Sequence, residues 1–551
     1  MAVALAAGAF LSAWAPSAHA EPPTVTIALV PRTTLVQRLA DAGFSVGLLS
    51  AGTGDVTAEH TYRDISAGNR EPPPSDAVPG LLRSTLSRAG LSASLRRLHV
   101  APGDLSSLVA HLRGDDLLIA LGKPPPPDNR ALPIGIAGAG FGGTLTSNST
   151  RTGGYVLSTD LAPTILRRLG VSVPEQMDGE PIRAEGKVDA DAVAKRGERM
   201  TAVADWRIQV PTACLALWLL SAIVFGLVAP SRRRTAAAWL GLAFAYMPLL
   251  LLAGAALRPE FAAYEGLLVA VGAGGLAAVT LRFARGWWAA AVACAVTVGV
   301  YAIDMVTGSE LTKLSLLGPN PIYGARFYGI GNELEALFAV MVPFGVAAAL
   351  TATVARAPRA VFCLLAAGGV AAIVFGAGGW GADVGAAIVL PLGAAVAAVV
   401  VDGNAEGSRL RLICFVLAAP VLGLGLLALI DLVSGANAHL TRSVLVAGGA
   451  RDLADIAQRR LDLSAHDFAQ AAGNPLFWIV VLGIAAGIAK WRRIDGWLEP
   501  FPAARAGVIG ACAAVAVGVL VNDSGATFLV LGSLALGAAV AFAWAQAGTN
   551  P

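Results

Sequence analysis

The residues best suited to chemistry stand in one stretch, residues 322–338, where polar side chains open a long apolar run. The stretch reads IYGARFYGIGNELEALF. Its guanidinium, Arg326, has the planar shape that matches a phosphate group. Its first carboxylate, Glu333, belongs to a type of group that serves as a general base or metal ligand. Ionisable groups at membrane depth are costly unless they are paired or hydrated, so this stretch is a candidate functional site.

Further polar residues gather at the ends of other apolar runs. They are Asp304, Trp380, Asp383, Asp431, His439, Arg442, Asn522 and Asp523. As catalytic candidates we take three carboxylates, Glu333, Asp383 and Asp523. As groups that would hold a substrate we take the following basic, amide and aromatic side chains: Arg326, Tyr328, Asn332, His439, Arg442 and Asn522. The sequence assigns no metal ligands and leaves any cofactor unknown.

Each candidate also has a structural interpretation. Asp523 and Asn332 could cap helices. Arg326 and Glu333 could form an ion pair that holds the loop in place. Glu335 lies one turn inside the apolar run, so we expect it to face a cavity or a partner rather than lipid.

The elements that must position these groups are apolar runs of about 20 residues, the length that crosses a hydrocarbon core. The chain is 56% hydrophobic and 14% charged, far below the charge of soluble domains. We therefore predict an all-α, multi-pass membrane domain over residues 206–551. About eleven spans are expected. They cover residues 208–229, 236–256, 261–281, 287–306, 333–355, 360–379, 382–401, 411–433, 474–490, 504–521 and 525–546.

The basic residues orient these spans. Lysines and arginines follow the first, third, fifth, seventh and ninth spans, at Arg232–Arg234, Arg282, Arg356, Arg409 and Lys490 among others. The positive-inside rule places these loops in the cytoplasm, and the polar segments above then lie at the outer face. The C-terminus is expected inside. Residues 1–20 resemble a secretory signal that ends in Ala18-His19-Ala20, which also places the following domain outside.

The longest outer loop, residues 434–473, carries leucine and isoleucine at roughly helical spacing among charged residues. Two interpretations remain open for it. It forms an amphipathic helix on the outer membrane interface, or a helix that packs on the soluble domain.

Residues 21–205 have the pattern of an α/β domain. Strand-like segments at residues 24–31, 44–50, 115–122 and 131–138 alternate with helical ones, and the first helix is expected to end at Gly43. This alternation predicts a parallel sheet between helices.

A family resemblance enters at Tyr155–Ile182, YVLSTDLAPTILRRLGVSVPEQMDGEPI. This segment resembles the C-terminal part of alkaline-phosphatase-superfamily domains of the sulfatase and phosphodiesterase type. TYRDISAGNR, residues 61–70, resembles the nucleophile-loop region of that family. The resemblance implies a shortened alkaline-phosphatase-like fold.

Active members of that superfamily hold metal ions through aspartates and histidines at fixed places. Here Pro31-Arg32 follows the first strand, KPPPPDN follows the segment at 115–122, and GGTLTSNSTR contains no histidine. The resemblance therefore implies a catalytically degenerate, metal-free domain. The layout as a whole resembles an uncharacterised family of bacterial envelope proteins.

Three functions fit these features, and the sequence leaves open whether the protein is an enzyme. The favoured one is a bacterial integral membrane protein of the cell envelope that acts on a lipid-linked or anionic substrate at the outer face of the cytoplasmic membrane. Arg326 and Arg442 would hold the anion. The alternatives are a transporter or flippase, and a non-catalytic scaffold with a pseudo-phosphatase domain. The expected partners are the bilayer and a lipid-linked envelope glycan or other envelope proteins. A net charge of +3 disfavours a nucleic-acid partner.

Overall fold

The computed structural model describes residues 22–52, 56–69, 80–126, 130–323, 326–403 and 463–547, with four isolated residues between 404 and 462. The chain divides into two compact units. The first comprises Met1–Glu198 with Ile322–Ala325, and the second comprises Arg199–Pro321 with Arg326–Pro551. The α/β pattern belongs to the first unit and the long apolar helices belong to the second, as the sequence predicts.

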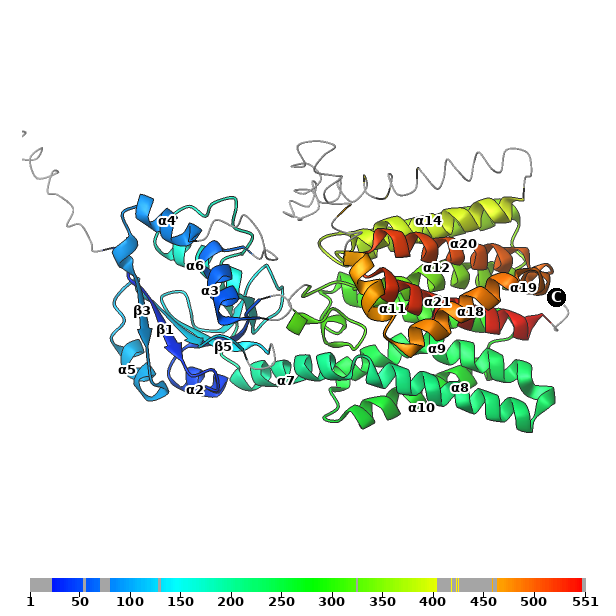
Figure 1. Ribbon diagram of the computed structural model, residues 1–551, viewed down its shortest axis with the longest axis horizontal. Coiled ribbons are helices and arrows are strands. Elements are labelled where there is room, and N and C mark those ends of the chain that lie inside the picture. Colours follow the sequence, from blue (N-terminus) through cyan, green and yellow to red (C-terminus); the bar gives the residue numbers. More distant parts are fainter. Residues whose placement is uncertain are drawn as a thin grey trace, which may run out of the picture. The chain divides into compact units, whose positions relative to one another are not determined.

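A mixed sheet forms the centre of the first unit (Figure 1). Its strands are β1 (Val25–Val30), β2 (Ser45–Ser50), β3 (Leu95–His99), β4 (Leu117–Gly122), β5 (Leu132–Gly138), β6 (Thr144–Thr146), β7 (Tyr155–Leu157) and β8 (Arg183–Glu185). Their order is β3-β1-β4-β5-β2-β6-β8, with β7 paired to β2. The four segments predicted as strands are confirmed as β1, β2, β4 and β5.

The prediction of a parallel sheet is wrong in part. β1 is parallel to β3 and β4, but β5 runs antiparallel to both β4 and β2. The connection from Gly122 to Leu132 explains the difference. A parallel pair needs a crossover of about a dozen residues or more, usually with a helix, and this connection is shorter.

Helices cover both faces of the sheet. They are α2 (Val36–Asp41), α3 (Ala58–Ala67), α4 (Leu81–Arg88), α5 (Leu105–Ala110) and α6 (Leu161–Arg168). Side chains of α3, α4 and α6, such as Ile65, Leu82 and Ile165, share one buried cluster with the sheet. Figure 1 shows these three helices together and α2 and α5 apart from them. As predicted, α2 ends near Gly43, whose φ of +92° suits glycine.

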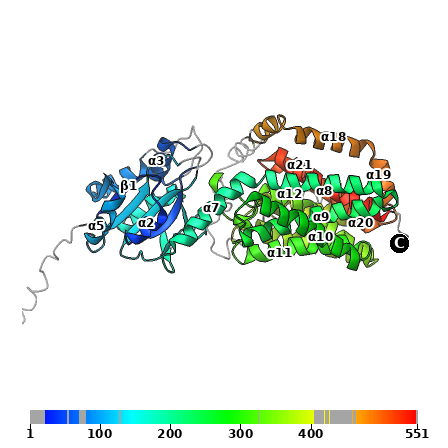
Figure 2. The same cartoon turned by 90° about the horizontal axis from the view of Figure 1, so that it is seen from below.

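The second unit is a bundle of long helices that lie side by side (Figures 1 and 2). They are α7 (Ala190–Trp206, which begins in the first unit), α8 (Gln209–Val228), α9 (Arg233–Leu257), α10 (Ala262–Phe283), α11 (Trp288–Val306), α12 (Asn332–Ala352), α13 (Ala357–Gly376), α14 (Val384–Asp402), α18 (Pro475–Ala489), α19 (Trp491–Leu498), α20 (Pro502–Val521) and α21 (Gly525–Gln546). Helices suit this apolar sequence because they satisfy their backbone hydrogen bonds internally.

Within the described residues, nine of these helices are long and apolar enough to cross a membrane. They match nine of the predicted spans. The predicted span 474–490 is the 15-residue helix α18, which follows the helix Leu463–Ala471 at a bend of 99°. All but three isolated residues of the predicted span 411–433 lie outside the described residues, as do residues 1–20 and most of the loop 434–473. The chain is therefore a multi-pass membrane protein by length and composition.

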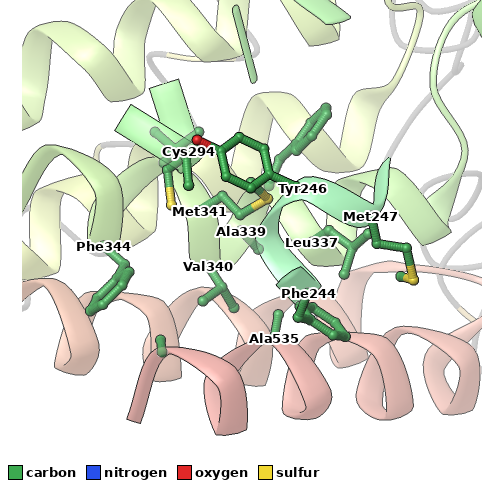
Figure 3. Packing of buried hydrophobic residues seen from close by; sticks show 14 of the residues in the cluster. Phe244, Tyr246, Met247, Cys294, Leu337, Ala339, Val340, Met341, Phe344 and Ala535 are labelled. Atoms are coloured by element: carbon green, nitrogen blue, oxygen red, sulfur yellow. The ribbon is translucent and has the colours of Figure 1, made fainter. Parts of the chain in front are cut away.

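Helix α12 lies at the centre of this bundle. Its apolar window is 83% buried, whereas those of α8 and α10 are 28% buried. Figure 3 shows its side chains among those of α9, α11 and α21, at Phe244, Cys294, Val340, Met341 and Ala535. Small residues permit close approach: a Cβ atom on Gly345 would lie 2.5 Å from the Cβ atom of Cys294. The polar stretch that opens α12 therefore enters the interior of the bundle.

Candidate functional site

The loop before α12 is fixed to the turn between α13 and α14. The Ile330 backbone N–H donates to the Gly381 carbonyl at 2.9 Å, and the Gly329 N–H donates to Ser309 Oγ at 3.2 Å. Gly329 has a φ of +79°, and a Cβ atom there would lie 2.0 Å from the Gly381 oxygen. Glycine is required at this position because no other residue fits the backbone and the space.

Arg326 forms an ion pair with Asp383 across this contact. Its Nη1 donates to Asp383 Oδ2 at 2.7 Å and also to the Ile330 carbonyl. Asp383 is 2% exposed and its Oδ1 accepts from the Ala386 N–H at 3.3 Å, so it also caps α14. Burial lowers the pKa of Arg326, but the charge and hydrogen bond of Asp383, together with the charges of Asp523 and Glu335, outweigh it, and the net pKa is raised. The guanidinium therefore stays charged.

Glu333 takes a different partner from the one that the sequence indicated. Its Oε1 lies 2.5 Å from Nη2 of Arg207, which also donates to the Gly318 carbonyl at 3.3 Å. The structural pair expected between Arg326 and Glu333 is therefore corrected to two pairs, Arg326 with Asp383 and Arg207 with Glu333. The second pair joins the start of α12 to the segment between α7 and α8.

Glu335 has no exposed surface. Its Oε1 accepts from Asn522 Nδ2 at 3.2 Å, and its Oε2 has no hydrogen-bond partner within the described part of the chain. Gly385, near the start of α14, leaves room for it: a Cβ atom there would lie 2.6 Å from Glu335 Oε2 and 2.7 Å from Asn522 Oδ1. The expectation that Glu335 faces a partner rather than lipid is confirmed.

The turn between α20 and α21 brings two more candidates to the same place. Asn522 is 6% exposed and Asp523 Oδ1 accepts from Asn332 Nδ2 at 2.7 Å. We call the following group the α12 site: Arg326, Asn332, Glu335, Asp383, Asn522 and Asp523. Its members come from the starts of α12 and α14, the loop before α12 and the turn after α20.

The remaining candidates lie apart from this group or outside the description. Tyr328 is half-buried in the loop that carries Arg326. Asp304 accepts from the backbone N–H groups of Leu311 and Thr312, so it holds the loop after α11. His439, Arg442 and Asp431 lie outside the described residues. Trp380 is 37% exposed in the turn before Asp383.

Two buried contacts escaped the sequence analysis. One is Arg207 with Glu333. The other is a pair of hydrogen bonds from Arg199 to Glu265, at 2.5 and 2.9 Å, in which both side chains are almost fully buried. Glu265 inside an apolar run is a signal that could have found the second pair, because a lone carboxylate there requires a partner.

The arrangement of the α12 site suits recognition of an anion beside a carboxyl group. Helices α12, α14 and α21 all begin there, and helix N-termini carry partial positive charge. Both hydrogen bonds that Arg326 makes to described residues come from Nη1, so Nη2 and Nε can bind a ligand. The charge of Arg326 also acts on the buried carboxyl of Glu335, whose Oε2 has no hydrogen-bond partner among the described residues.

In the first unit, the TDL segment at residues 159–161 has a structural role. Asp160 is fully buried and its carboxylate accepts from Ser147 Oγ, Ser149 Oγ and the backbone N–H groups of Leu157 and Glu180. Burial raises its pKa, while these four donors favour the ionised form. Among the residues that the structure describes, no group of three or more histidines, cysteines or acidic residues could hold a metal ion.

Comparison of the chain with protein-family models, curated proteins and solved structures gives no match. The resemblance to alkaline-phosphatase-superfamily domains is therefore a proposal that depends on Tyr155–Ile182 and on residues 61–70.

Proposed function

We propose that this protein is a bacterial cell-envelope membrane protein that binds an anionic, lipid-linked substrate at the outer face of the cytoplasmic membrane. The observation that carries the proposal is Arg326. Its side chain is 35% exposed, and it uses one nitrogen for its described hydrogen bonds while Asp383 fixes its orientation. An arginine held in this way can offer its other two nitrogens to a phosphate group.

The charges around Arg326 favour a lipid-linked anion over a free one. Asp383 and Asp523 both act on Arg326 electrostatically and reduce the attraction for a small anion. A prenyl chain in the bilayer adds apolar burial that a free phosphate lacks, at about 0.8 kcal/mol for each CH₂ group. We therefore expect a polyprenyl phosphate to bind and inorganic phosphate to compete weakly.

The basic loops support the outer face as the location of the site. Arg232 and Arg356 follow α8 and α12, Arg282 lies in the last turn of α10, and Arg505 lies near the start of α20. The α12 site lies at the opposite ends of α12 and α20. The positive-inside rule then places it outside.

The shortened first unit would serve as a binding or recruiting domain. It resembles phosphatase-type domains, but its sequence lacks the metal ligands that hydrolysis requires at the positions where that family carries them. This interpretation leaves the chemistry, if any, to the α12 site.

A transporter is the second candidate, but the placement of charge favours a site at one face. A transport pathway requires polar groups near mid-membrane. In the described spans, the buried acidic residues Glu265, Asp304 and Glu335 all lie close to a helix end.

The test is a binding measurement with full-length protein in lipid nanodiscs and a fluorescent polyprenyl phosphate as the probe. We expect Arg326→Ala to weaken binding about ten- to hundredfold, since charge-assisted hydrogen bonds contribute about 1.5–3 kcal/mol. Arg326→Lys keeps the charge without the forked geometry and should retain part of the affinity.

The matched control is Arg505→Ala. Arg505 is also ion-paired, to Asp495 at 2.6 Å, but at the other end of α20. Binding should be unchanged in that variant. Equal affinity of the wild-type and Arg326→Ala proteins would rule the proposal out.

A further inference from the structure

The unpartnered oxygen of Glu335 presents a chemical problem. A buried carboxylate oxygen without a donor is strongly destabilising, and buried charges are normally paired. Glu335 is fully buried, and the one described donor to its carboxyl, Asn522 Nδ2, bonds to Oε1. An ionised Glu335 would therefore leave Oε2 without a described donor in a buried position.

The charged groups around Glu335 make an ionised carboxylate there still less favourable. The Glu335 carboxyl lies beside the start of α14, where a Cβ atom on Gly385 would be 2.6 Å from its Oε2, and Asp383 caps this helix and acts directly on Glu335, so two acidic groups meet there. Arg326 is the cation that acts on both, but its described hydrogen bond goes to Asp383 Oδ2. Asp383 also accepts from the backbone at the start of α14. Asp383 thus has the donors of an ionised carboxylate, and Glu335 lacks them.

We propose that Glu335 and Asp383 share one proton, which Glu335 holds on Oε2 and donates to Asp383. Every contact is then satisfied. Glu335 Oε1 accepts from Asn522, Oε2–H donates to Asp383, and Asp383 remains ionised beside Arg326. The pair is a proton site built into the start of α12 and α14.

The site can supply a proton to a ligand at Arg326, a step that rests on the proposed function. The O–H bond to Glu335 Oε2 breaks as an O–H bond to Asp383 forms, and the negative charge passes from Asp383 to Glu335. Asp383 then passes the proton to a basic oxygen on the bound substrate. Glu335 is a proton reservoir that acts through Asp383.

Infrared spectroscopy of full-length protein in nanodiscs tests the shared proton without any ligand. A protonated carboxyl group absorbs at a higher frequency than a carboxylate, and the band moves when H₂O is replaced by D₂O. We expect Glu335→Gln to remove one such band at neutral pH. Asp383→Asn replaces the charged acceptor with a neutral amide oxygen, a weaker acceptor, and should shift the band.

The matched control is Glu333→Gln, two residues away on the same helix and paired with Arg207. This variant should leave the band in place. In thermal unfolding, by contrast, Glu333→Gln should have the larger effect of the two variants. Glu335→Gln imitates the protonated acid, because the glutamine amide donates to Asp383, and should keep the wild-type Tm. Glu333→Gln leaves the charge of Arg207 without its partner and should lower the Tm.

Two results would overturn the proposal. One is a carboxyl band that is unchanged in both Glu335→Gln and Asp383→Asn. The other is a loss of Tm in Glu335→Gln as large as in Glu333→Gln. Because neither measurement uses polyprenyl phosphate, this failure is distinct from a failure of lipid binding.

Discussion

At the scale of single residues, the two glutamates of GNELE have different roles although they lie two positions apart. Glu333 is about a quarter exposed and paired with an arginine at 2.5 Å, which is the normal condition of an ionised carboxylate. Glu335 is fully buried with one oxygen unpartnered among the described residues. On a helix, positions two apart face different sides, so each meets a different environment.

The Arg207–Glu333 pair should stabilise the protein. Both side chains are largely buried, so removal of either one leaves the other without compensation. We expect Arg207→Ala and Glu333→Ala each to lower the Tm by several degrees. The double variant should lose much less stability than the sum of the two single losses. Expressed as free energy of unfolding, the coupling should be about 0.5–3 kcal/mol. Purely additive losses would show that the two side chains do not interact.

At the scale of elements, the spans were predictable and the contacts between their ends were not. Long apolar runs identify α8 to α14, α20 and α21 because each run must cross the hydrocarbon core. Arg326 and Asp383 are 57 residues apart in the chain, and Asn522 and Glu335 are 187 apart. No local pattern links such residues, because packing of α12 against α14 and α20 decides which helix ends meet.

The mixed sheet of the first unit shows the same limit. Hydrophobic runs located β1, β2, β4 and β5, but strand direction depends on the connections. The short link between β4 and β5 was the available signal, and the alternation of strands and helices outweighed it in the prediction.

The glycine at the contact between the α12 loop and the α13–α14 turn should be intolerant of any side chain. Gly329→Ala places a Cβ atom against the Gly381 oxygen at a positive φ. We expect the free energy of unfolding to fall by at least about 2 kcal/mol. Polyprenyl phosphate should also bind more weakly, because Arg326 loses its position.

A suitable comparison is Gly369→Ala in the middle of α13. No atom lies within 4 Å of a Cβ atom at that position, and alanine favours helix. Stability should be unchanged or slightly higher. A Gly329→Ala protein with wild-type Tm and binding would contradict the assigned role of the loop contact.

At the scale of the whole molecule, the orientation in the membrane is the strongest prediction from charge. Trp380, in the turn beside the α12 site, and Arg356, between α12 and α13, are both exposed and lie at opposite ends of α13. Trp380→Cys should react with a membrane-impermeant maleimide in intact cells. Arg356→Cys should react after the membrane is permeabilised.

The natural cysteines set the background for that experiment. Those within the described residues are buried or half-buried, so the unmodified protein serves as the blank. The reverse labelling pattern would place the α12 site in the cytoplasm and exclude an outer-face substrate.

The unequal burial of the helices has a consequence for the surrounding lipid. Helices α8 and α10 are mostly turned away from the protein interior, and α8 has 20 residues whereas its neighbour α9 has 25. At about 1.5 Å per residue, these lengths are roughly 30 Å and 37 Å. The first turn of α9 carries Arg233 and Arg234, so its extra length extends into the headgroup region. Most of α9 is buried in the protein whereas most of α8 and α10 is not, so a bilayer of different thickness acts first on α8 and α10, while the contacts of the buried α12 stay unchanged.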